Sequence, residues 1–507
     1  MDKFLYFLDT KKRKICKKHH KSLGVIVDFS VFSKYITIEV VAIIDTLESN
    51  GFCAFVVGGC VRDMLLGIAP KDFDIATNAK PYEVVEIFTK AGHKCLEIGK
   101  QYGTIAVSKT QLEKIDSSAN KMPATKKSMD SSTKSSEFIE VTTFRKDSEY
   151  KDGRHPKSVE FGNSIYKDLA RRDFTINAIA FNPSIKEFID KFGGLNDLRL
   201  KRIACVGDPK SRFSEDYLRL LRALRFSSTL GFSIEKATKE TIKAQMQNLD
   251  SLSKERVQAE FSKLILGDFA TEILREYGEV LTLLFGVDFV DNEILEGIAL
   301  LNKTPKDLAT RLSVLCYALF GGFKGAKSSA KISSIESSKK AKATLKTLKY
   351  SNEIIKEVCF LLGFVDRALE CVCKAGVEQK IALKMLMRDC EKEAKIAQKR
   401  AESLLDFLGF ISNQNLATKI QKAKSSLKQI LRDEECFCLG GLAINGNEVR
   451  AIMQSQNKVA QNRKNDKEIG KILDFLLKSV IKGRVANTKS ALKSATKAYL
   501  ANHKGGA

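Results

Sequence analysis

Two stretches decide the fold that we expect for this chain, Phe55-Val-Val-Gly-Gly-Cys-Val-Arg-Asp63 and Pro70-Lys-Asp-Phe-Asp-Ile-Ala-Thr77. In the first, a strand-like apolar run enters two glycines and then a helical pattern, where bare backbone N–H groups and a helix N-terminus can hold a phosphate. In the second, Asp72 and Asp74 are two residues apart in a strand-like run, so both carboxylates point to one face. Adjacent carboxylates repel each other unless a divalent cation neutralises them, and Mg²⁺ is the expected cation.

The neighbouring patterns extend these stretches into a compact α/β unit. Apolar spacing and turn residues predict helices over 36–47 and 81–91, a short helix closed by Gly67, and strands over 54–57, 73–76, 103–107 and 138–144. Glu140 is an acid inside the last of these strands. It either lies on a polar surface or supplies a third metal carboxylate.

Two stretches rich in lysine and serine interrupt the apolar patterns. Residues 109–136 hold six Lys and seven Ser, and residues 324–342 hold six Lys and six Ser. We interpret both as solvated surface loops, with RNA contact as the alternative. From residue 214 onward the apolar spacing is three and four almost throughout, which predicts helices for the rest of the chain.

The charge balance favours a nucleic-acid partner. The 507 residues carry 85 Lys and Arg against 61 Asp and Glu, a formal charge of +24. Such a charge is typical of proteins that meet a polyanion, although a merely basic protein is the alternative. The apolar runs fall short of the ~20 residues that cross a bilayer, so we expect no membrane role. Scattered cysteines indicate reduced thiols and a cytoplasmic location.

Seven motifs in a fixed order carry a family resemblance. The chain resembles class II tRNA nucleotidyltransferases (CCA-adding enzymes) and bacterial poly(A) polymerases in GGCVRD (58–63), DFDIAT (72–77), EVTTFR (140–145), YKDGRHP (150–156), RRDFTINAIA (171–180), SEDYLRLLRALRF (214–226) and SKERVQAEF (253–261). The resemblance covers residues 38–268, and a weaker likeness continues at 442–449 and 469–489.

The resemblance implies an α+β fold, with a polymerase-β-like nucleotidyltransferase head of mixed β-sheet followed by an all-α neck, body and tail. The expected divisions are a basic N-terminal extension (1–35), the head (36–180, with the insertion 109–136), the neck with a base-reading helix (181–268), the body (269–400, with the stretch 324–342) and a tRNA-binding tail (401–507).

The same resemblance implies roles for individual residues. Asp72 and Asp74 bind two Mg²⁺ ions and, with Glu140, form the catalytic group, so that the RNA 3′-hydroxyl attacks the nucleotide α-phosphate in line. The nucleotide-binding residues are Gly58, Gly59, Arg62, Asp63, Arg171, Arg172, Asp173, Asn177, Asp216 and Arg219. A mobile loop contains Tyr150, Asp152 and Arg154, and Glu215, Arg222, Arg256 and Glu260 support the neck.

Asp216 and Arg219 are the residues expected to read the incoming base. We predict that Ser214 caps their helix and that a spacing of three places both on one face, where an intrahelical ion pair is the alternative role. A carboxylate only accepts hydrogen bonds and a guanidinium only donates them, which suits the amino group and ring nitrogen of cytosine and adenine. Protein side chains would thus replace a template.

The predicted function is addition of CCA to the 3′ end of tRNA from CTP and ATP, with release of pyrophosphate. The segment from Glu97 to Val107 is similar to the CCA-type version of this region. Partial addition of CC or of A alone, and poly(A) addition, are the alternatives. We expect tRNA as the partner and no DNA.

Overall fold

The computed structural model describes residues 30–99, 102–111, 137–147, 159–287, 292–321, 333–391, 393–412, 414–455 and 464–502. The chain divides into two compact units, residues 1–264 and 265–507, which are described separately. The predicted loop residues Tyr150, Asp152 and Arg154 lie outside the described residues, as do nearly all of the N-terminal extension and most of the 109–136 insertion.

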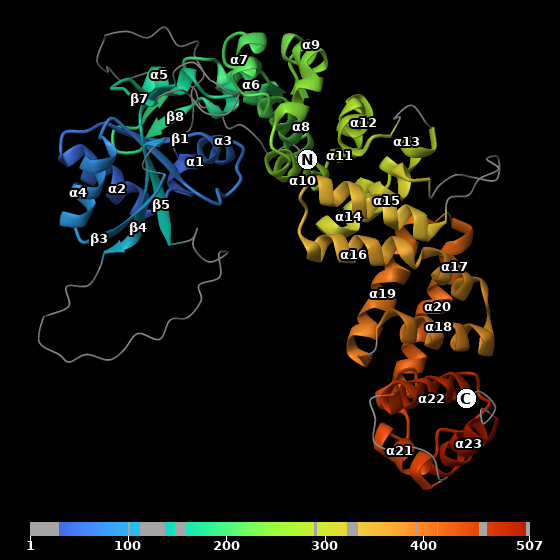
Figure 1. The fold of residues 1–507 in the computed structure, drawn as a ribbon. Coiled ribbons are helices and arrows are strands. Elements are labelled where there is room, and N and C mark those ends of the chain that lie inside the picture. The colour runs from blue at the N-terminus through green and yellow to red at the C-terminus, as the bar shows by residue number, and fades with distance from the viewer. Residues whose placement is uncertain are drawn as a thin grey trace, which may run out of the picture. The chain divides into compact units, whose positions relative to one another are not determined.

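A seven-stranded sheet forms the centre of the first unit (Figure 1). Its order is β3-β4-β5-β2-β1-β8-β9, and only the central β2–β5 pair of it is parallel. The sheet is therefore mixed, as predicted. Its strands are β1 (Ala54–Val57), β2 (Asp74–Thr77), β3 (His93–Gly99), β4 (Thr104–Gln111), β5 (Phe138–Thr143), β8 (Ala180–Asn182) and β9 (Glu187–Ile189). The strands β3, β8 and β9 were not expected from the sequence.

Helices pack on both faces of this sheet, because successive residues of each strand point to opposite faces. The helices α2 (Ile38–Ser49) and α4 (Pro81–Lys90) pack on one face, and α2 buries Val40, Ile43, Ile44 and Leu47 completely or almost so. On the opposite face, α5 (Ile165–Ala170) contributes to a core around Ala76 and Phe144. Two short strands, β6 (Arg145–Asp147) and β7 (Val159–Phe161), pair beside it. The helix α3 (Gly59–Leu65) follows β1 directly, as predicted.

After the sheet and the short helix α6 (Gly194–Arg199), four helices lie in the region predicted to be the neck: α7 (Pro209–Glu215), α8 (Leu218–Leu230), α9 (Lys236–Gln245) and α10 (Lys254–Ile265). The predicted helix cap at Ser214 is wrong. Ser214 lies in the last turn of α7, where its hydroxyl donates to the carbonyl of Lys210. Asp208 caps α7 instead, and α8 begins only after Asp216, whose backbone is extended. Two helices therefore replace the single one expected.

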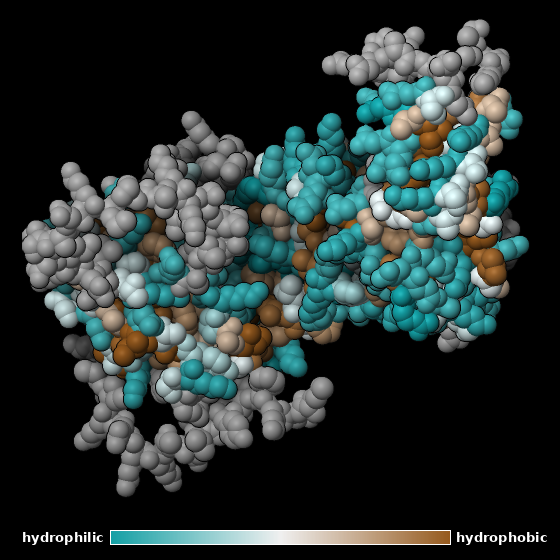
Figure 2. Space-filling view, turned by 90° about the horizontal axis from the view of Figure 1, so that it is seen from below, coloured by the Kyte–Doolittle hydropathy of each residue, from teal (hydrophilic) through white to brown (hydrophobic). Residues whose placement is uncertain are grey.

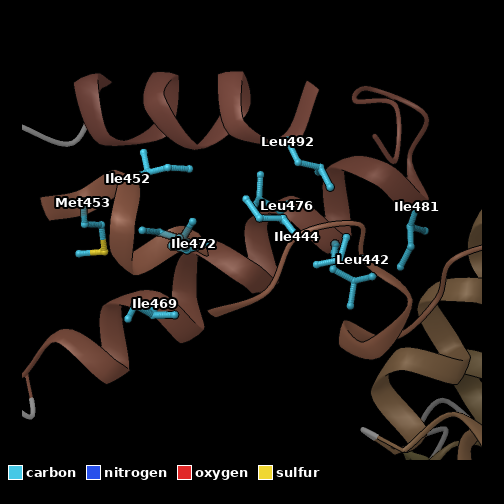
Figure 3. Close-up of a cluster of buried hydrophobic side chains, with 11 residues drawn as sticks. Leu442, Ile444, Ile452, Met453, Ile469, Ile472, Leu476, Ile481 and Leu492 are labelled. Atoms are coloured by element: carbon cyan, nitrogen blue, oxygen red, sulfur yellow. The ribbon is translucent and has the colours of Figure 1, made fainter. Parts of the chain in front are cut away.

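The second unit is helical in its described residues, as the spacing predicted. Figure 3 shows its C-terminal core, in which Leu442, Ile472 and Leu492 belong to a cluster of buried side chains. The helices are α11 (Ala270–Glu276), α12 (Glu279–Phe285), α13 (Asn292–Ile298), α14 (Leu308–Leu319), α15 (Ser334–Thr347), α16 (Asn352–Gly363), α17 (Val365–Cys373), α18 (Gly376–Cys390), α19 (Ala394–Ile411), α20 (Gln414–Arg432), α21 (Gly446–Ser455), α22 (Lys464–Ile481) and α23 (Lys489–Asn502).

The loop predicted over residues 324–342 is partly wrong. Its second half belongs to α15, which starts at Ser334 with a cap from the Ser333 hydroxyl and runs to Thr347. Ser337 and Ala341 are buried on this helix. Small residues at a spacing of four allow close helix packing, so lysine and serine content alone was a misleading signal here.

The described surface is largely polar. In the face drawn in Figure 2, hydrophilic residues predominate and the hydrophobic ones form separate small patches. None of the helices in the described ranges has the length and apolar character that crossing a membrane requires. The cysteines within these ranges are all free thiols.

Candidate active site

The sheet brings the predicted carboxylates to the end of two neighbouring strands. Asp74 is the first residue of β2 and pairs in parallel register with Glu140 of β5. Asp72 precedes the strand, so the predicted strand start at Phe73 is one residue early. The side chains of Asp72, Asp74 and Glu140 are all exposed. The three acids therefore gather at one solvent-accessible edge.

Two of these acids, Asp74 and Glu140, have a raised pKa. The pKa of Asp74 lies above its ordinary value mainly because protein atoms displace water around its carboxylate. Asp72 raises this pKa further, while the positive charge of Arg172 lowers it. Although the Glu140 side chain is exposed, nearby protein atoms displace part of its water and raise its pKa, and Asp74 and then Asp72 raise it further. No ion pair within the described ranges involves any of the three. Uncompensated carboxylates of this kind are the donor set that a divalent cation prefers.

The described residues contain no group of three or more His, Cys, Asp or Glu side chains close enough to hold a metal ion. The role of Glu140 as a third metal carboxylate stays a prediction. Asp72 and Asp74 remain the predicted metal ligands, and Glu140 lies beside Asp74 on the neighbouring strand.

Gly58 forms the tight turn between β1 and α3 beside these acids. Its φ of 81° is a conformation that glycine adopts readily. A Cβ atom at Gly58 would lie 2.7 Å from Nη1 of Arg172 and 3.8 Å from Oδ2 of Asp74. The absence of a side chain at Gly58 thus leaves room for the Arg172 guanidinium beside the Asp74 carboxylate.

Arg171 and Arg172 are both anchored by Asp168, which the sequence analysis did not single out. Asp168 is 1% exposed, and its oxygens lie 2.8 Å from Arg171 Nη2 and 3.3 Å from Arg172 Nη2. Burial alone would raise the pKa of Asp168, but the two guanidinium groups hold it below its ordinary value. The Nε of Arg172 is buried without a protein partner. Asp168 thus holds both arginines in place, and the Nε–H group of Arg172 remains able to donate a hydrogen bond.

A second network joins α3 to the neck. Arg62 Nη1 donates to Oδ1 of Asn177 over 2.7 Å, while Arg62 Nη2 donates to Asp63 over 2.7 Å. Asp173 accepts from Asn177 Nδ2 over 3.2 Å and, through its other oxygen, from Nε and Nη2 of Arg222 over 2.8 and 2.6 Å. Burial would raise the pKa of Asp173, yet these donors, Arg222 first, lower it to about 2.

The contacts of Asp216 and Arg219 do not fit their alternative role, an intrahelical ion pair with each other. Arg219 does not pair with Asp216; its Nη1 lies 2.5 Å from Oε2 of Glu215 and 2.7 Å from the carbonyl of Arg212. Asp216 accepts from Arg256 Nη2 over 2.7 Å, and Nη1 of Arg256 is buried without a protein partner. The break between α7 and α8 explains why the two residues have different partners. Asp216 is not on a helix, so it shares no helix face with Arg219.

Arg225 and Phe226 of α8 belong to the site, although the sequence analysis missed them. Arg225 Nε lies 2.8 Å from Oε2 of Glu260, a charge contact without hydrogen-bond geometry. Burial lowers the pKa of Arg225 to about 10, with a further lowering by Arg222 that Glu260 partly offsets. Their spacing from Arg222, three and four residues, is the helical signal that would have found them.

These side chains line one cavity of about 500 Å³ in the first unit. Seven arginines and three aspartates surround it, a balance of 7 − 3 = +4. The lining is Gly58, Gly59, Arg62, Asp74, Arg171, Arg172, Asp173, Asn177, Asp216, Leu218, Arg219, Arg222, Arg225, Phe226 and Arg256. A basic cavity that contains Asp74 at the strand ends and Asp216 in the neck suits a polyanion with one hydrogen-bonding end.

The mixed sheet, the strand-end carboxylates and the basic cavity define a polymerase-β-like nucleotidyltransferase. Family models match as "Poly A polymerase head domain" over residues 54–204 and "Probable RNA and SrmB- binding site of polymerase A" over residues 231–280. The CCA-adding enzyme of Bacillus pumilus (strain SAFR-032) is 30% identical over 453 residues, 89% of this chain and 95% of that protein. The chain belongs to the family of CCA-adding enzymes.

Other relatives match over the first half of the chain. The CCA-adding enzyme of Geobacillus sp. (strain WCH70) is 42% identical over 236 residues, 46% of this chain and 51% of that protein. The match thus spans about half the length of such curated relatives. A crystal structure of the Bacillus stearothermophilus CCA-adding enzyme in complex with CTP is 26% identical, with a TM-score of 0.65 over 92% of this chain and 98% of that one. Thermotoga maritima CCA-adding enzyme complexed with tRNA shares the fold at 18% identity and a TM-score of 0.58 over 93% and 98%.

Proposed function

We propose that this chain adds CCA to the 3′ end of tRNA from CTP and ATP, without a template and with release of pyrophosphate. The observation that carries the proposal is the single cavity that joins Asp74 at the sheet edge to Asp216 in the neck, lined by seven arginines. The relatives named CCA-adding enzymes favour this product over the alternatives. We place the reaction in the cytoplasm.

Asp72 and Asp74 are the residues that would hold divalent metal, which nucleotidyltransferases of this family generally use. Their exposed and unpaired carboxylates fit this role, and Mg²⁺ is the ion that we propose. Two bound ions would offset the negative charge that develops on the attacking RNA 3′-oxygen and on the departing pyrophosphate. Glu140 keeps the local charge negative beside them.

The triphosphate would lie along the glycine turn and the arginines. Gly58 and Gly59 allow the nucleotide to approach the backbone at the start of α3, and Arg172 is held 2.7 Å from the position of a Gly58 Cβ. Asp168 keeps Arg171 and Arg172 extended toward the cavity. Prearranged guanidinium groups bind phosphate oxygens without the cost of reorganising. Asn177 and Asp173 hold Arg62 and Arg222 in the same way.

The base would be selected at the neck end. Asp216 offers acceptor oxygens and Arg256 offers the unpartnered Nη1, while Arg219 is 8% exposed and braced by Glu215. Cytosine and adenine each present an amino donor beside a ring-nitrogen acceptor, which complements a carboxylate next to a guanidinium. Uracil and guanine present a carbonyl in place of the amino group, which would set an acceptor oxygen against the Asp216 carboxylate.

In the deciding experiment, purified protein and Mg²⁺ are incubated with three tRNA transcripts. One ends at the discriminator base, one after the first added C and one after CC. CTP and ATP are given separately and together, and the 3′ ends are sequenced. Complete CCA on the shortest transcript is the expected result. A product that stops at CC, or A added only to a CC end, would show a split pathway. Long A tails on unrelated RNA would show a poly(A) polymerase instead.

A further inference from the structure

Phe226 of α8 sits beneath three arginines of the cavity. The guanidinium carbons of Arg225, Arg62 and Arg222 lie 4.0, 5.1 and 5.5 Å from the centre of its ring. All three are within the ~6 Å at which a cation is attracted to an aromatic face. A single aromatic side chain thus contacts three of the seven cavity arginines.

The three arginines come from different parts of the first unit. Arg222 and Arg225 belong to α8 with Phe226, whereas Arg62 belongs to α3 in the head. The ring therefore links the glycine turn that starts α3 to the neck helix. Phe174, which is 0% exposed, backs the ring edge-on with centroids 5.7 Å apart. Phe226 itself is 6% exposed, so it is fixed in position and largely shielded from water.

Three neighbouring cations need more than carboxylate partners. Arg62 pairs with Asp63, Arg222 with Asp173 and Arg225 with Glu260. Even so, the pKa of Arg225 is lowered to about 10, first by burial and then by the positive charges of Arg222 and Arg62. Glu260 and Asp173 oppose this lowering only in part. A polarisable ring attracts all three guanidinium groups at once and takes up no hydrogen-bond donor, so their remaining donors stay directed to the cavity.

We propose that Phe226 is a positioning residue for the nucleotide triphosphate, which holds Arg62 of the head and Arg222 and Arg225 of the neck in one arrangement through its aromatic face. The inference rests on the proposed function, since it assigns these arginines to the nucleotide. It differs from a packing role, because the electron density of the ring is required and its volume alone is insufficient.

The test compares Phe226→Leu with a graded series in which Phe226 is replaced by mono-, di- and trifluorinated phenylalanine. Fluorine weakens the attraction of the ring for cations and hardly changes its size. Phe213→Leu is the matched control, because Phe213 is a fully buried ring of α7 that does not line the cavity. KM and kcat for CTP and ATP, CTP binding by calorimetry, and Tm are measured for each protein.

Phe226→Leu should raise KM for both nucleotides about tenfold and change kcat much less. The fluorinated proteins should follow in order of fluorination at nearly constant Tm, while Phe213→Leu lowers Tm and leaves KM unchanged. A KM for Phe226→Leu within twofold of the wild type, or no ordering with fluorination, would overturn the proposal. If the wild type adds no nucleotides but CTP binding still weakens in the predicted order, the proposed function fails and the role of Phe226 stands.

Discussion

Asp74 and Asp173 line the same cavity, yet the structure treats the two carboxylates in opposite ways. Asp173 receives two hydrogen bonds from Arg222 and further ones from Asn177 and the backbone, and its pKa falls to about 2. The pKa of Asp74 is raised by the protein atoms that displace water around it and, less strongly, by Asp72, although Arg172 opposes this. Acids with arginine partners thus stabilise the arginines of the cavity, while the acids at the strand ends have no ion-pair partner in the described part of the chain and, under the proposed function, are available to a divalent cation.

The largest expected effect comes from removing the available charge. Asp72→Asn or Asp74→Asn should lower the rate of addition on the order of 1,000-fold with CTP and ATP alike, because the donor set for divalent metal is lost. The Asp74→Asn protein should be no less stable than the wild type, since its carboxylate is destabilised in the folded state. Single-turnover addition and Tm check both.

Glu187→Gln is the matched control, because Glu187 is an exposed acid on the edge strand β9 of the same sheet. It should leave the rate unchanged. Full activity of Asp72→Asn would refute the assignment of the metal site.

A smaller effect should follow from filling the space beside Asp74. Gly58→Ala forces a side chain into a backbone with φ of 81° and places it 2.7 Å from Arg172 Nη1. Displacing that guanidinium by about 1 Å should lower kcat/KM roughly 100-fold. Gly409→Ala, at a helix position with no atom within 4 Å of the new Cβ, should leave kcat/KM unchanged. Equal kinetics for the two variants would contradict the claim that the space beside Gly58 is needed for the Arg172 guanidinium.

At the partnered end, changes should affect selection more than rate. Arg219→Ala removes the group that braces Glu215 and the carbonyl of Arg212, so Asp216 loses its fixed surroundings. Selection of CTP and ATP over UTP and GTP should fall roughly 10- to 100-fold, the equivalent of one unsatisfied buried polar group. Competition assays with all four nucleotides measure it. An unchanged selection profile would limit Arg219 to support of the neck.

The smallest effect is on stability in acid. Because the pKa of Asp173 is about 2 in the folded state and 3.8 ordinarily, its ionised form stabilises the fold above pH 4 by about 2 kcal/mol. This contribution should disappear as the pH falls from 4 to 2. The stability difference between wild type and Asp173→Asn, measured by urea unfolding with circular dichroism, should narrow over that range. A constant difference would mean that Asp173 is not stabilised by its donors.

The sequence predicted the parts of the fold that depend on local chemistry. The strand at Ala54–Val57, the glycine turn, the helix at Pro81 and the strand at Phe138 lie where apolar spacing and turn residues placed them. It failed where distant residues decide. The strands β8 and β9 are three residues each and are held by pairing with β1 and with each other, a signal too short to recognise in isolation.

For the candidate site, the sequence by itself determined which side chains are present and that Asp72 and Asp74, two residues apart in an extended run, point to one face. The pairing that puts Glu140 beside Asp74 joins strands that are far apart in the chain, and it came from the fold. Only the tertiary structure decided the partners. Arg256 holds Asp216 from 40 residues away, and Phe226 collects Arg62 from another helix. Hydrogen bonds and cation–π contacts form between residues that the fold brings together, and local spacing carries no information about them.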